Sequence, residues 1–347
     1  MPRVVSFDAP LQVSIVEEPA APLAPGQVRL RTLYSGISAG TELTAYRGTN
    51  PYLDRRWDSA SRLFVEGEVG LTYPVRGWGY EECGEVVEVA DDVSSLSPGD
   101  RVWGQWGHRT ETVQPATKYA ARRLPDGVDP ELGIFSQIGA IALNLVLDAD
   151  IHLGETVVLF GLGVPGQLAA QMARLNGSRV IGVDSLAPRR ELAKRLGADI
   201  VLDPAQVNVG SEVRRLTGNR GADVVLEVTG NYGAMHEAIR CAAYNSRVVV
   251  ASFLQGPGTG LRLGEEFHHN RIEVVCSQIS GVAPRYQHRW DFERLASTAM
   301  DLITSGRVCA GELITQRFPA ADAPHAFELL HATPQEALQV VLDFTQE

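Results

Sequence analysis

One six-residue segment, Gly161-Leu162-Gly163-Val164-Pro165-Gly166, constrains the fold of this chain more than any other feature. It fits the pattern G-x-G-x-x-G, follows the apolar run 156–160 and precedes a helical pattern at 167–175. With 34 glycines in the chain a chance match is plausible, so this context carries the argument. Such glycines permit a tight turn, the approach of the backbone to a pyrophosphate, and close packing of helix on strand. The segment therefore predicts a dinucleotide site at a helix N-terminus, where Pro165 is tolerated in the first turn.

Strands and helices alternate beyond this segment, which predicts βαβ units and a parallel sheet. The first ~140 residues instead carry short alternating runs between Gly- and Pro-rich turns, which is typical of a small twisted β-domain. A tail after residue 282 is expected to return to this β-domain. The expected strands of the parallel sheet are 156–160, 179–183, 223–228 and 247–251, and the expected helices between them are 167–175, 188–196 and 233–243. In the tail we expect helices at 292–305 and 324–330 and a strand at 337–342.

Length and composition set the class of protein. A chain of 347 residues predicts about two domains, and a formal charge of −11 argues against a nucleic-acid partner. No uninterrupted apolar run reaches the ~20 residues of a membrane span, and the first residues lack the apolar stretch of a signal peptide. The cysteines form no CxxC pair and no dense disulfide framework. We expect a soluble, reduced, cytoplasmic protein without a membrane partner; its four cysteines are Cys83, Cys241, Cys276 and Cys309.

The acidic residue after the second expected strand indicates which dinucleotide binds. Asp184 stands 18 residues after Gly166, where a carboxylate accepts hydrogen bonds from the adenine ribose and repels a 2′-phosphate. This favours NAD over NADP. Arg189, with Arg190 beside it, leaves three interpretations open: a receptor for that phosphate, a ribose contact, or a solvated helix face.

Several motifs resemble those of the medium-chain dehydrogenases/reductases over essentially the whole chain. The narrower resemblance is to the bacteriochlorophyllide a dehydrogenases, which share the SGISxGTE, GYE and C-terminal patterns. The resemblance implies an α/β protein with a GroES-like β-domain at 1–138 and 282–347, and an inserted Rossmann domain, a doubly wound parallel sheet, at 139–281. The motifs are 35–42 (SGISAGTE), 79–88 (GYEECGEVVE), 98–102 (PGDRV), the glycine loop, 196–199 (LGAD) and 313–321 (LITQRFPAA).

The departures from the zinc-dependent members of that family predict a site without metal. At the positions of the three catalytic zinc ligands the chain holds Ser38, Tyr80 and Gln137, and none of these is a good zinc ligand. The four-cysteine structural zinc lobe is missing after Val102. Zinc is not expected elsewhere either, because adjacent histidines at 268–269 point in different directions on a regular element. The pair His108 and Glu111 lies in an expected loop.

Without zinc, hydrogen-bond donors have to polarise the substrate oxygen. Tyr80 carries a phenol suited to this, but a base near neutral pH needs a pKa well below ~10. A buried structural tyrosine is the alternative. Thr41 matches the family position whose hydroxyl touches the reacting oxygen. Glu42 replaces an aspartate that supports the zinc histidine, so we expect it to orient Tyr80 or titrate with it, unless it is structural. Ser38 and Gln137 either line the site as polar contacts or fill space.

Residues 49–75 form a long segment with aromatic and charged residues, suited to recognising a polyhydroxylated ring. A mobile lid without substrate contact is the alternative. Trp57 from this segment, Trp78 and Glu81 are the candidate substrate contacts. Residues after the later strands are expected to face the nicotinamide, as in relatives. The candidate cofactor residues are Gly161, Gly163, Val164, Pro165, Gly166, Asp184, Arg189, Thr229, Ser252, Phe253 and Gln278.

These expectations combine into one leading function. The chain is expected to be a zinc-independent, NAD(H)-dependent dehydrogenase that interconverts a secondary alcohol (a sugar, cyclitol or specialised metabolite) and a ketone. Zinc-free quinone or enoyl reductases are an alternative, although those relatives usually prefer NADPH. A non-catalytic NAD-binding sensor is another. We expect a homodimer or homotetramer that acts on a small molecule.

Overall fold

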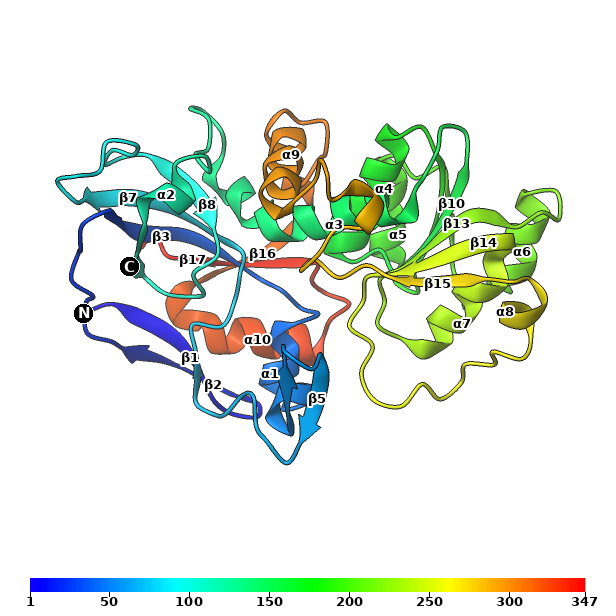
Figure 1. Ribbon diagram of the computed structural model, residues 1–347, viewed down its shortest axis with the longest axis horizontal. Helices are drawn as coiled ribbons and strands as arrows, with labels where there is room; N and C mark the ends of the chain where they lie inside the picture. Colours follow the sequence, from blue (N-terminus) through cyan, green and yellow to red (C-terminus); the bar gives the residue numbers. More distant parts are fainter. Residues whose placement is uncertain (347) are drawn as a thin grey trace. The chain divides into compact units, whose positions relative to one another are not determined.

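The computed structural model describes residues 1–346 and divides them into two compact units (Figure 1). Unit 1 comprises residues 1–137 and the chain from 314 onward, and unit 2 comprises 138–313. The chain returns to unit 1 later than the expected residue 282. The reason is that α9 (Phe292–Thr304) packs on α3 (Ser136–Ala149), where a Cβ atom on Gly139 would lie 3.1 Å from the Cβ of Ala299.

Unit 2 is built on six parallel strands in the order β12-β11-β10-β13-β14-β15. The first strand in the sequence, β10, lies in the middle and is buried along its whole length, as in a sheet covered on both faces. This is the strand order of a doubly wound dinucleotide-binding sheet, which confirms the predicted fold class. The strands are β10 (Thr156–Phe160), β11 (Arg179–Val183), β12 (Ile200–Leu202), β13 (Ala222–Glu227), β14 (Ala242–Val250) and β15 (Glu273–Cys276).

Helices connect these strands and cover the sheet. On one face, side chains from β10, β11 and β13 share a buried apolar core with two of the helices, α6 and α7. β12, α6 and β15 were not expected from the sequence, because each is only three to eight residues long. Besides α3 and α9, the helices of unit 2 are α4 (Val164–Leu175), α5 (Ala187–Arg195), α6 (Val209–Leu216), α7 (Tyr232–Cys241) and α8 (Glu266–His269).

The stretch Pro130–Ala149, which ends in α3, is the one described helical segment long and apolar enough to cross a membrane. Polar residues are scattered through it, so a search for uninterrupted apolar runs missed it. Of its most apolar window, 83% is buried inside the protein. A core helix has this property, and we assign the stretch to the protein interior.

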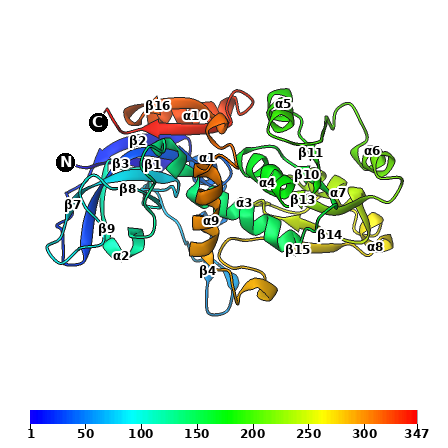
Figure 2. The ribbon, with the colours of Figure 1, turned by 90° about the horizontal axis from the view of Figure 1, so that it is seen from above.

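Unit 1 is a β-structure assembled from both ends of the chain. The C-terminal strand β17 pairs antiparallel with β3 and parallel with β16, as expected for a tail that returns to the N-terminal domain. Figure 2 shows this C-terminal segment beside the first strands. The strands are β1 (Arg3–Ala9), β2 (Gln12–Glu17), β3 (Gln27–Ile37), β6 (Val75–Arg76), β7 (Glu82–Val89), β8 (Arg101–Gly104), β9 (Glu111–Pro115), β16 (Ile314–Pro319) and β17 (Gln339–Asp343); the helices are α1 (Glu42–Arg47), α2 (Ala116–Tyr119) and α10 (Ala323–Ala332).

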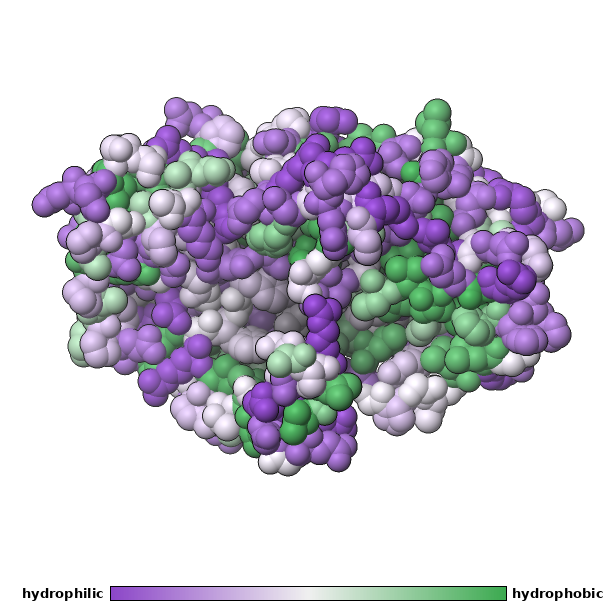
Figure 3. All heavy atoms as spheres, viewed as in Figure 1, coloured by the Kyte–Doolittle hydropathy of each residue, from purple (hydrophilic) through white to green (hydrophobic). Residues whose placement is uncertain are grey.

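The long segment at 49–75 contains a two-stranded hairpin of β4 (Arg55–Asp58) and β5 (Leu63–Glu66). Trp57 and Phe64 face each other across it with ring centroids 5.1 Å apart, and each is 40% exposed. Figure 3 shows hydrophobic and charged side chains intermixed on this hairpin, at the bottom of the view. The aromatic side chains of the hairpin are thus presented on the surface.

Candidate active site

The glycine loop joins the end of β10 to the start of α4, as predicted. Gly161 has a φ of +93° and donates its N–H to the Val183 carbonyl (2.9 Å), so a residue with a side chain would be strained there. A Cβ atom on Gly166 would lie 1.9 Å from the Gly161 oxygen, so this glycine is required by packing. At Gly163 a Cβ atom would meet no protein atom closer than 3.9 Å. Protein packing therefore does not require Gly163, and a bare backbone here is what the approach of a pyrophosphate requires.

Val164 and Pro165 form the first turn of α4, as the sequence predicted for this part of the site. Val164 is buried, and Pro165 supplies no N–H in a turn where that group has no partner within the helix. Both residues hold the helix N-terminus under the open space at Gly163.

Asp184 follows β11 directly and holds the glycine loop in place. Its Oδ2 accepts the Leu162 N–H and its Oδ1 accepts the Leu186 N–H, both at 2.8 Å. The side chain is buried, which makes these charge-assisted bonds worth more than exposed ones. Each oxygen keeps a second lone pair for a ribose hydroxyl. The structure thus adds an anchoring role to the one expected from the sequence.

The two arginines after Asp184 have different surroundings. Arg190 donates to the Asp184 carbonyl (2.7 Å) and to the Asp203 carboxylate (2.8 Å), so it belongs to the framework. The guanidinium of Arg189 lies beside the glycine loop, with Nη1 3.9 Å from the Cβ position of Gly163. Arg189 is therefore the arginine placed to contact a bound dinucleotide.

A buried carboxylate that sequence analysis missed organises the ends of β13 and β14. Glu227 is fully buried and accepts hydrogen bonds from the Thr229 N–H (2.7 Å), the Thr229 hydroxyl and the Ser252 hydroxyl. It thereby joins two predicted cofactor residues. Glu227 ends an apolar run, and an acid in that position was the available signal.

The remaining predicted cofactor residues lie on surface loops of unit 2. Phe253 is 45% exposed, and Gln278 caps its own turn by accepting the Ser280 N–H at 2.7 Å. Neither shows a contact with the glycine loop, so their assignment to the cofactor remains a prediction.

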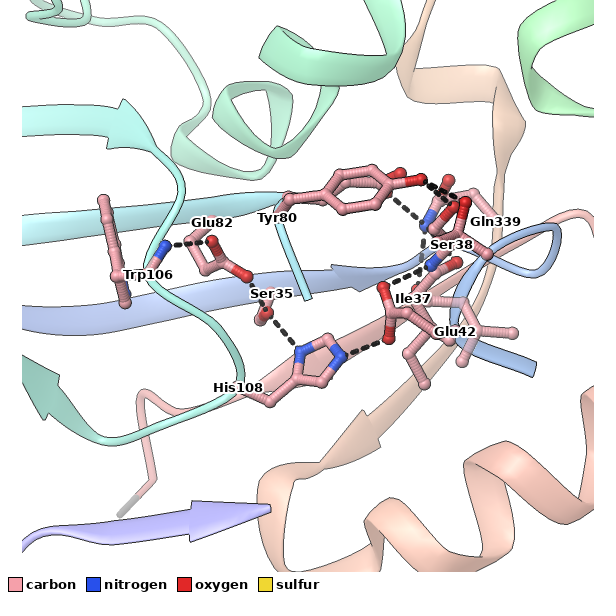
Figure 4. Close-up of polar contacts among 12 residues, drawn as sticks. Ser35, Ile37, Ser38, Glu42, Tyr80, Glu82, Trp106, His108 and Gln339 are labelled. Atoms are coloured by element: carbon pink, nitrogen blue, oxygen red, sulfur yellow. Dashed lines mark hydrogen bonds and ion pairs between the residues drawn. The ribbon is translucent and has the colours of Figure 1, made fainter. Parts of the chain in front are cut away.

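In unit 1 the structure brings together three predicted residues. The Tyr80 hydroxyl lies 2.5 Å from Ser38 Oγ and donates to Thr41 Oγ1 at 3.1 Å (Figure 4). Ser38 follows β3, Thr41 precedes α1, and Tyr80 precedes β7, so three element ends present hydroxyl groups at one point. Burial, followed by the nearby Glu81 carboxylate, raises the pKa of Tyr80. A raised pKa keeps the phenol protonated at neutral pH.

Glu42 makes no direct hydrogen bond to Tyr80 among those described, and its contacts fit the structural alternative. Glu42 is fully buried, accepts the Ser38 N–H (2.9 Å) with Oε1 and lies 2.5 Å from His108 Nε2 with Oε2. Its partner is a histidine that the sequence analysis considered only as a zinc ligand in a loop. The signal available in the sequence was a histidine in an apolar, aromatic stretch, Trp103 to His108.

Two further predicted residues have other surroundings. Glu81 is 1% exposed and accepts from the Gln339 side chain at 3.2 Å, so it has no surface with which to contact substrate. Burial, with the Glu42 and Glu82 charges, raises the pKa of Glu81. Gln137 accepts from the Gln105 amide, and none of the hydrogen bonds described for it reaches Tyr80.

The two predicted tryptophans also differ in their surroundings. Trp78 packs on the unit 1 core, and among the described residues its buried indole N–H finds no acceptor. The indole nitrogen has no accessible surface, so a ligand oxygen does not reach it in this arrangement. Trp57 lies on the exposed hairpin described above.

The donor chemistry at the family's zinc positions does not fit zinc. Alcohol, phenol and amide oxygens replace the thiolate, imidazole and carboxylate ligands that zinc takes in proteins. Within residues 1–346 one group of potential metal ligands comes together, His236 with Glu265 and Glu266. Arg262 already supplies a cation there, 2.9 Å from His236 Nε2 and 3.1 Å from Glu265.

Comparisons with known proteins agree with this architecture. Residues 165–295 match the family model described as "Zinc-binding dehydrogenase". D-guloside 3-dehydrogenase of Escherichia coli K12 is 29% identical over 344 residues, covering 97% of this chain and 98% of the relative. The crystal structure of 2R,3R-butanediol dehydrogenase from Bacillus subtilis superposes with a TM-score of 0.79 at 21% identity, with 99% of each chain covered. These comparisons confirm the predicted resemblance to the alcohol dehydrogenase-like proteins of the medium-chain dehydrogenases/reductases.

Dehydrogenases of this family need a nicotinamide cofactor. Two further solved neighbours carry such cofactors, each with a TM-score of 0.76 and 99% of each chain covered. An alcohol dehydrogenase of Escherichia coli CFT073, at 20% identity, was solved with NADH, and a protein of Sinorhizobium meliloti 1021, at 22% identity, with NADP. The fold therefore admits either dinucleotide, and the residues of each chain decide between them.

Proposed function

We propose that this dehydrogenase interconverts a secondary alcohol and a ketone with NAD(H) and without zinc. The observation that carries the proposal is the hydroxyl cluster of Tyr80, Ser38 and Thr41, which occupies unit 1 where the family's zinc ligands are expected. A cluster of donors at a reacting oxygen supplies the stabilisation of developing charge that a metal ion otherwise provides.

Preference for NAD rests on Asp184. A 2′-phosphate near this buried carboxylate would face a like charge, whereas a ribose hydroxyl would find an acceptor. NAD supplies the acceptor for the hydride when it is bound. The glycine loop, the α4 N-terminus and Arg189 are the residues that would hold its phosphates.

The chemistry assigned to the hydroxyl cluster is that of a hydrogen-bond donor. Because the pKa of Tyr80 is raised, its phenol stays protonated at neutral pH. Its single proton is directed at Thr41 Oγ1 in this structure and would turn to a bound ketone oxygen as charge develops on that oxygen. Ser38 and Thr41 hold the phenol from both sides.

The substrate class follows from the relatives together with the surface of unit 1. The names D-guloside 3-dehydrogenase and 2R,3R-butanediol dehydrogenase both denote oxidation of secondary alcohols. The exposed aromatic pair Trp57 and Phe64 suits stacking on a sugar ring. We therefore propose a sugar or related polyol as substrate.

The function is tested by following NADH at 340 nm with glycosides, free polyols, simple secondary alcohols, ketones and enones, each with NAD(H) and NADP(H). The proposal predicts turnover of secondary alcohols and ketones with NAD(H). Turnover of enones alone contradicts it, and tight NADH binding with no turnover of any compound indicates a sensor.

A further inference from the structure

Four fully buried polar side chains form a continuous row beneath the hydroxyl cluster. They run from Glu42 through His108 and Ser35 to Glu82, and each is 0% exposed (Figure 4). His108 Nε2 lies 2.5 Å from Glu42 Oε2 and Nδ1 lies 2.6 Å from Ser35 Oγ. Ser35 donates to Glu82 Oε1 at 3.2 Å. No role in the proposed reaction has yet been given to His108.

The hydrogen bonds of this row determine the protonation of His108. Glu82 Oε1 accepts the Ser35 proton, so Ser35 Oγ has to accept from Nδ1 of the imidazole. With Glu42 ionised, its Oε2 accepts from Nε2 on the other side. Both ring nitrogens therefore donate, and His108 is an imidazolium paired with Glu42, a combination that a buried site tolerates only when the charges are paired.

The imidazolium contacts the two backbone segments that carry the hydroxyl cluster. Through Glu42 it is linked to the Ser38 N–H (2.9 Å), and the Glu42 N–H in turn donates to the Ser38 carbonyl (2.9 Å). On the other side the ring lies against Gly79, where a Cβ atom would come within 2.9 Å of Nε2. Gly79 has a φ of +128° and directly precedes Tyr80. One ring therefore lies against both segments.

We infer that His108 is a positioning residue for the dehydrogenase site. It fixes the Ser38 backbone through Glu42 and the Tyr80 backbone through its contact with Gly79. The phenol and the hydroxyl groups that bond to it are thereby kept within hydrogen-bond distance. The inference rests on the proposed function for its kinetic consequence, but the positions of the side chains do not depend on which alcohol is oxidised. A misplacement of about 1 Å at a reacting group costs about 10²-fold in rate.

The first test measures Tyr80 without turnover. The nine tyrosines are replaced by 3-fluorotyrosine, and the Tyr80 fluorine resonance is assigned by its loss in Tyr80→Phe. His108→Met, which keeps volume but removes the donor, should shift this resonance. Signals from Tyr232, Tyr244 and Tyr286 in unit 2 should stay in place. An unmoved Tyr80 signal in folded His108→Met contradicts the inference.

The second test separates the hydrogen bond from packing. His108→Gln retains one N–H toward Glu42 and should keep more of kcat than His108→Met, which should lose about 10- to 10²-fold. KM should change less than kcat in both. His236→Gln, a buried histidine of unit 2, is the matched control and should leave kcat and the fluorine signal of Tyr80 unchanged. Equal kcat for the Gln and Met variants, or wild-type kcat in both, overturns the inference.

A third variant tests the same role if the His108 variants fail to fold. Glu42→Gln keeps the size and an acceptor for the Ser38 N–H but removes the charge that pairs with His108, so it should shift the same fluorine signal. An unshifted signal contradicts the role of the pair. Wild-type protein that oxidises no alcohol would refute the proposed function alone, because the fluorine measurement still tests the positioning.

Discussion

The hydroxyl of Tyr80 lies 2.5 Å from Oγ of Ser38, so the two residues that the family resemblance predicts at zinc-ligand positions are bonded to each other. Both positions could be aligned from sequence, but only the structure shows that they meet. Thr41 completes the cluster at 3.1 Å. A single neutral donor site, and not a ligand set, is the chemistry that this arrangement offers a substrate oxygen.

Tyr80→Phe removes the proposed donor while keeping the ring. We expect kcat to fall about 10²-fold or more, since removing one hydrogen-bond donor to a developing oxyanion costs about 10²–10³-fold. NADH affinity, measured by fluorescence, should be unchanged. Tyr73→Phe is the matched control: its hydroxyl bonds to the Ala45 carbonyl in the same unit, and its loss should cost about 1 kcal/mol of stability without affecting kcat. Wild-type turnover in Tyr80→Phe would remove the phenol from the mechanism.

Two glycines of the same loop should respond differently to alanine. In Gly163→Ala the new Cβ meets no protein atom closer than 3.9 Å, so the free energy of unfolding should be unchanged. NADH binding should weaken about tenfold or more, because the new methyl group blocks the approach of the cofactor's phosphates to the backbone. In Gly166→Ala the Cβ overlaps the Gly161 oxygen, so stability itself should drop by about 1–3 kcal/mol. Thermal unfolding and NADH titration of both variants make the comparison. Unimpaired NADH binding in Gly163→Ala contradicts the site.

Asp184→Asn should narrow the preference for NADH over NADPH. Removing the charge lifts the repulsion of a 2′-phosphate and weakens hydrogen bonds worth about 1.5–3 kcal/mol when charged, so the ratio of the two Kd values should change about tenfold or more. Asp199→Asn is the matched control, because Asp199 also accepts a backbone N–H (Val180, 2.8 Å) on the same sheet. An unchanged ratio in Asp184→Asn means that this carboxylate does not contact the ribose.

The buried row in unit 1 predicts a pH dependence of stability. Burial alone would lower the pKa of His108, but Glu42 and then Glu82 outweigh it and raise the pKa. A histidine pKa that is higher in the folded than in the unfolded state stabilises the folded protein. This contribution is fully present below the pKa of the unfolded state, about 6.5, and is lost as the pH rises through the pKa of the folded state. Burial raises the pKa of Glu81 and of Glu82. A raised carboxyl pKa also makes the folded protein less stable as the pH rises, beginning at a lower pH because carboxyl groups of the unfolded chain titrate near about 4.3.

The measurement compares urea unfolding of wild type and His108→Gln between pH 5 and 9. The groups facing the imidazole are Glu42, Ser35, Glu82 and the Phe327 ring, and the two acids are shared by both proteins. The stability difference between the proteins should therefore shrink as the pH rises above about 6.5. A difference that is constant or grows with pH contradicts the assigned charge.

The sequence was most informative where local chemistry dictates structure. The glycine loop, β10, β11 and the return of β17 to β3 were predictable, because turn glycines and buried apolar runs act over a few residues. Short elements such as β12 and α6 were missed, since three to eight residues carry too little periodicity. The end of the inserted unit was misplaced because the packing of α9 on α3 is a long-range contact.

The polar interior of unit 1 was beyond prediction for the same reason. His108 is 66 positions from Glu42 and 73 from Ser35, and nothing in the local sequence of any of the three indicates the others. Glu81 was a candidate substrate contact, yet it is buried and accepts from Gln339, a residue 258 positions away in the sequence. The family resemblance predicted which residues form the site. The buried residues that hold them in place could be identified only from the folded structure.

The central claim, alcohol oxidation without zinc, is tested most directly by measuring turnover against metal content in the same preparation. The protein is dialysed against chelator, its zinc is quantified by mass spectrometry, and NAD reduction is followed at 340 nm before and after adding zinc back. The account predicts full turnover with well under one zinc per chain and no gain on adding zinc. Loss of turnover with the metal, restored by stoichiometric zinc, would contradict it.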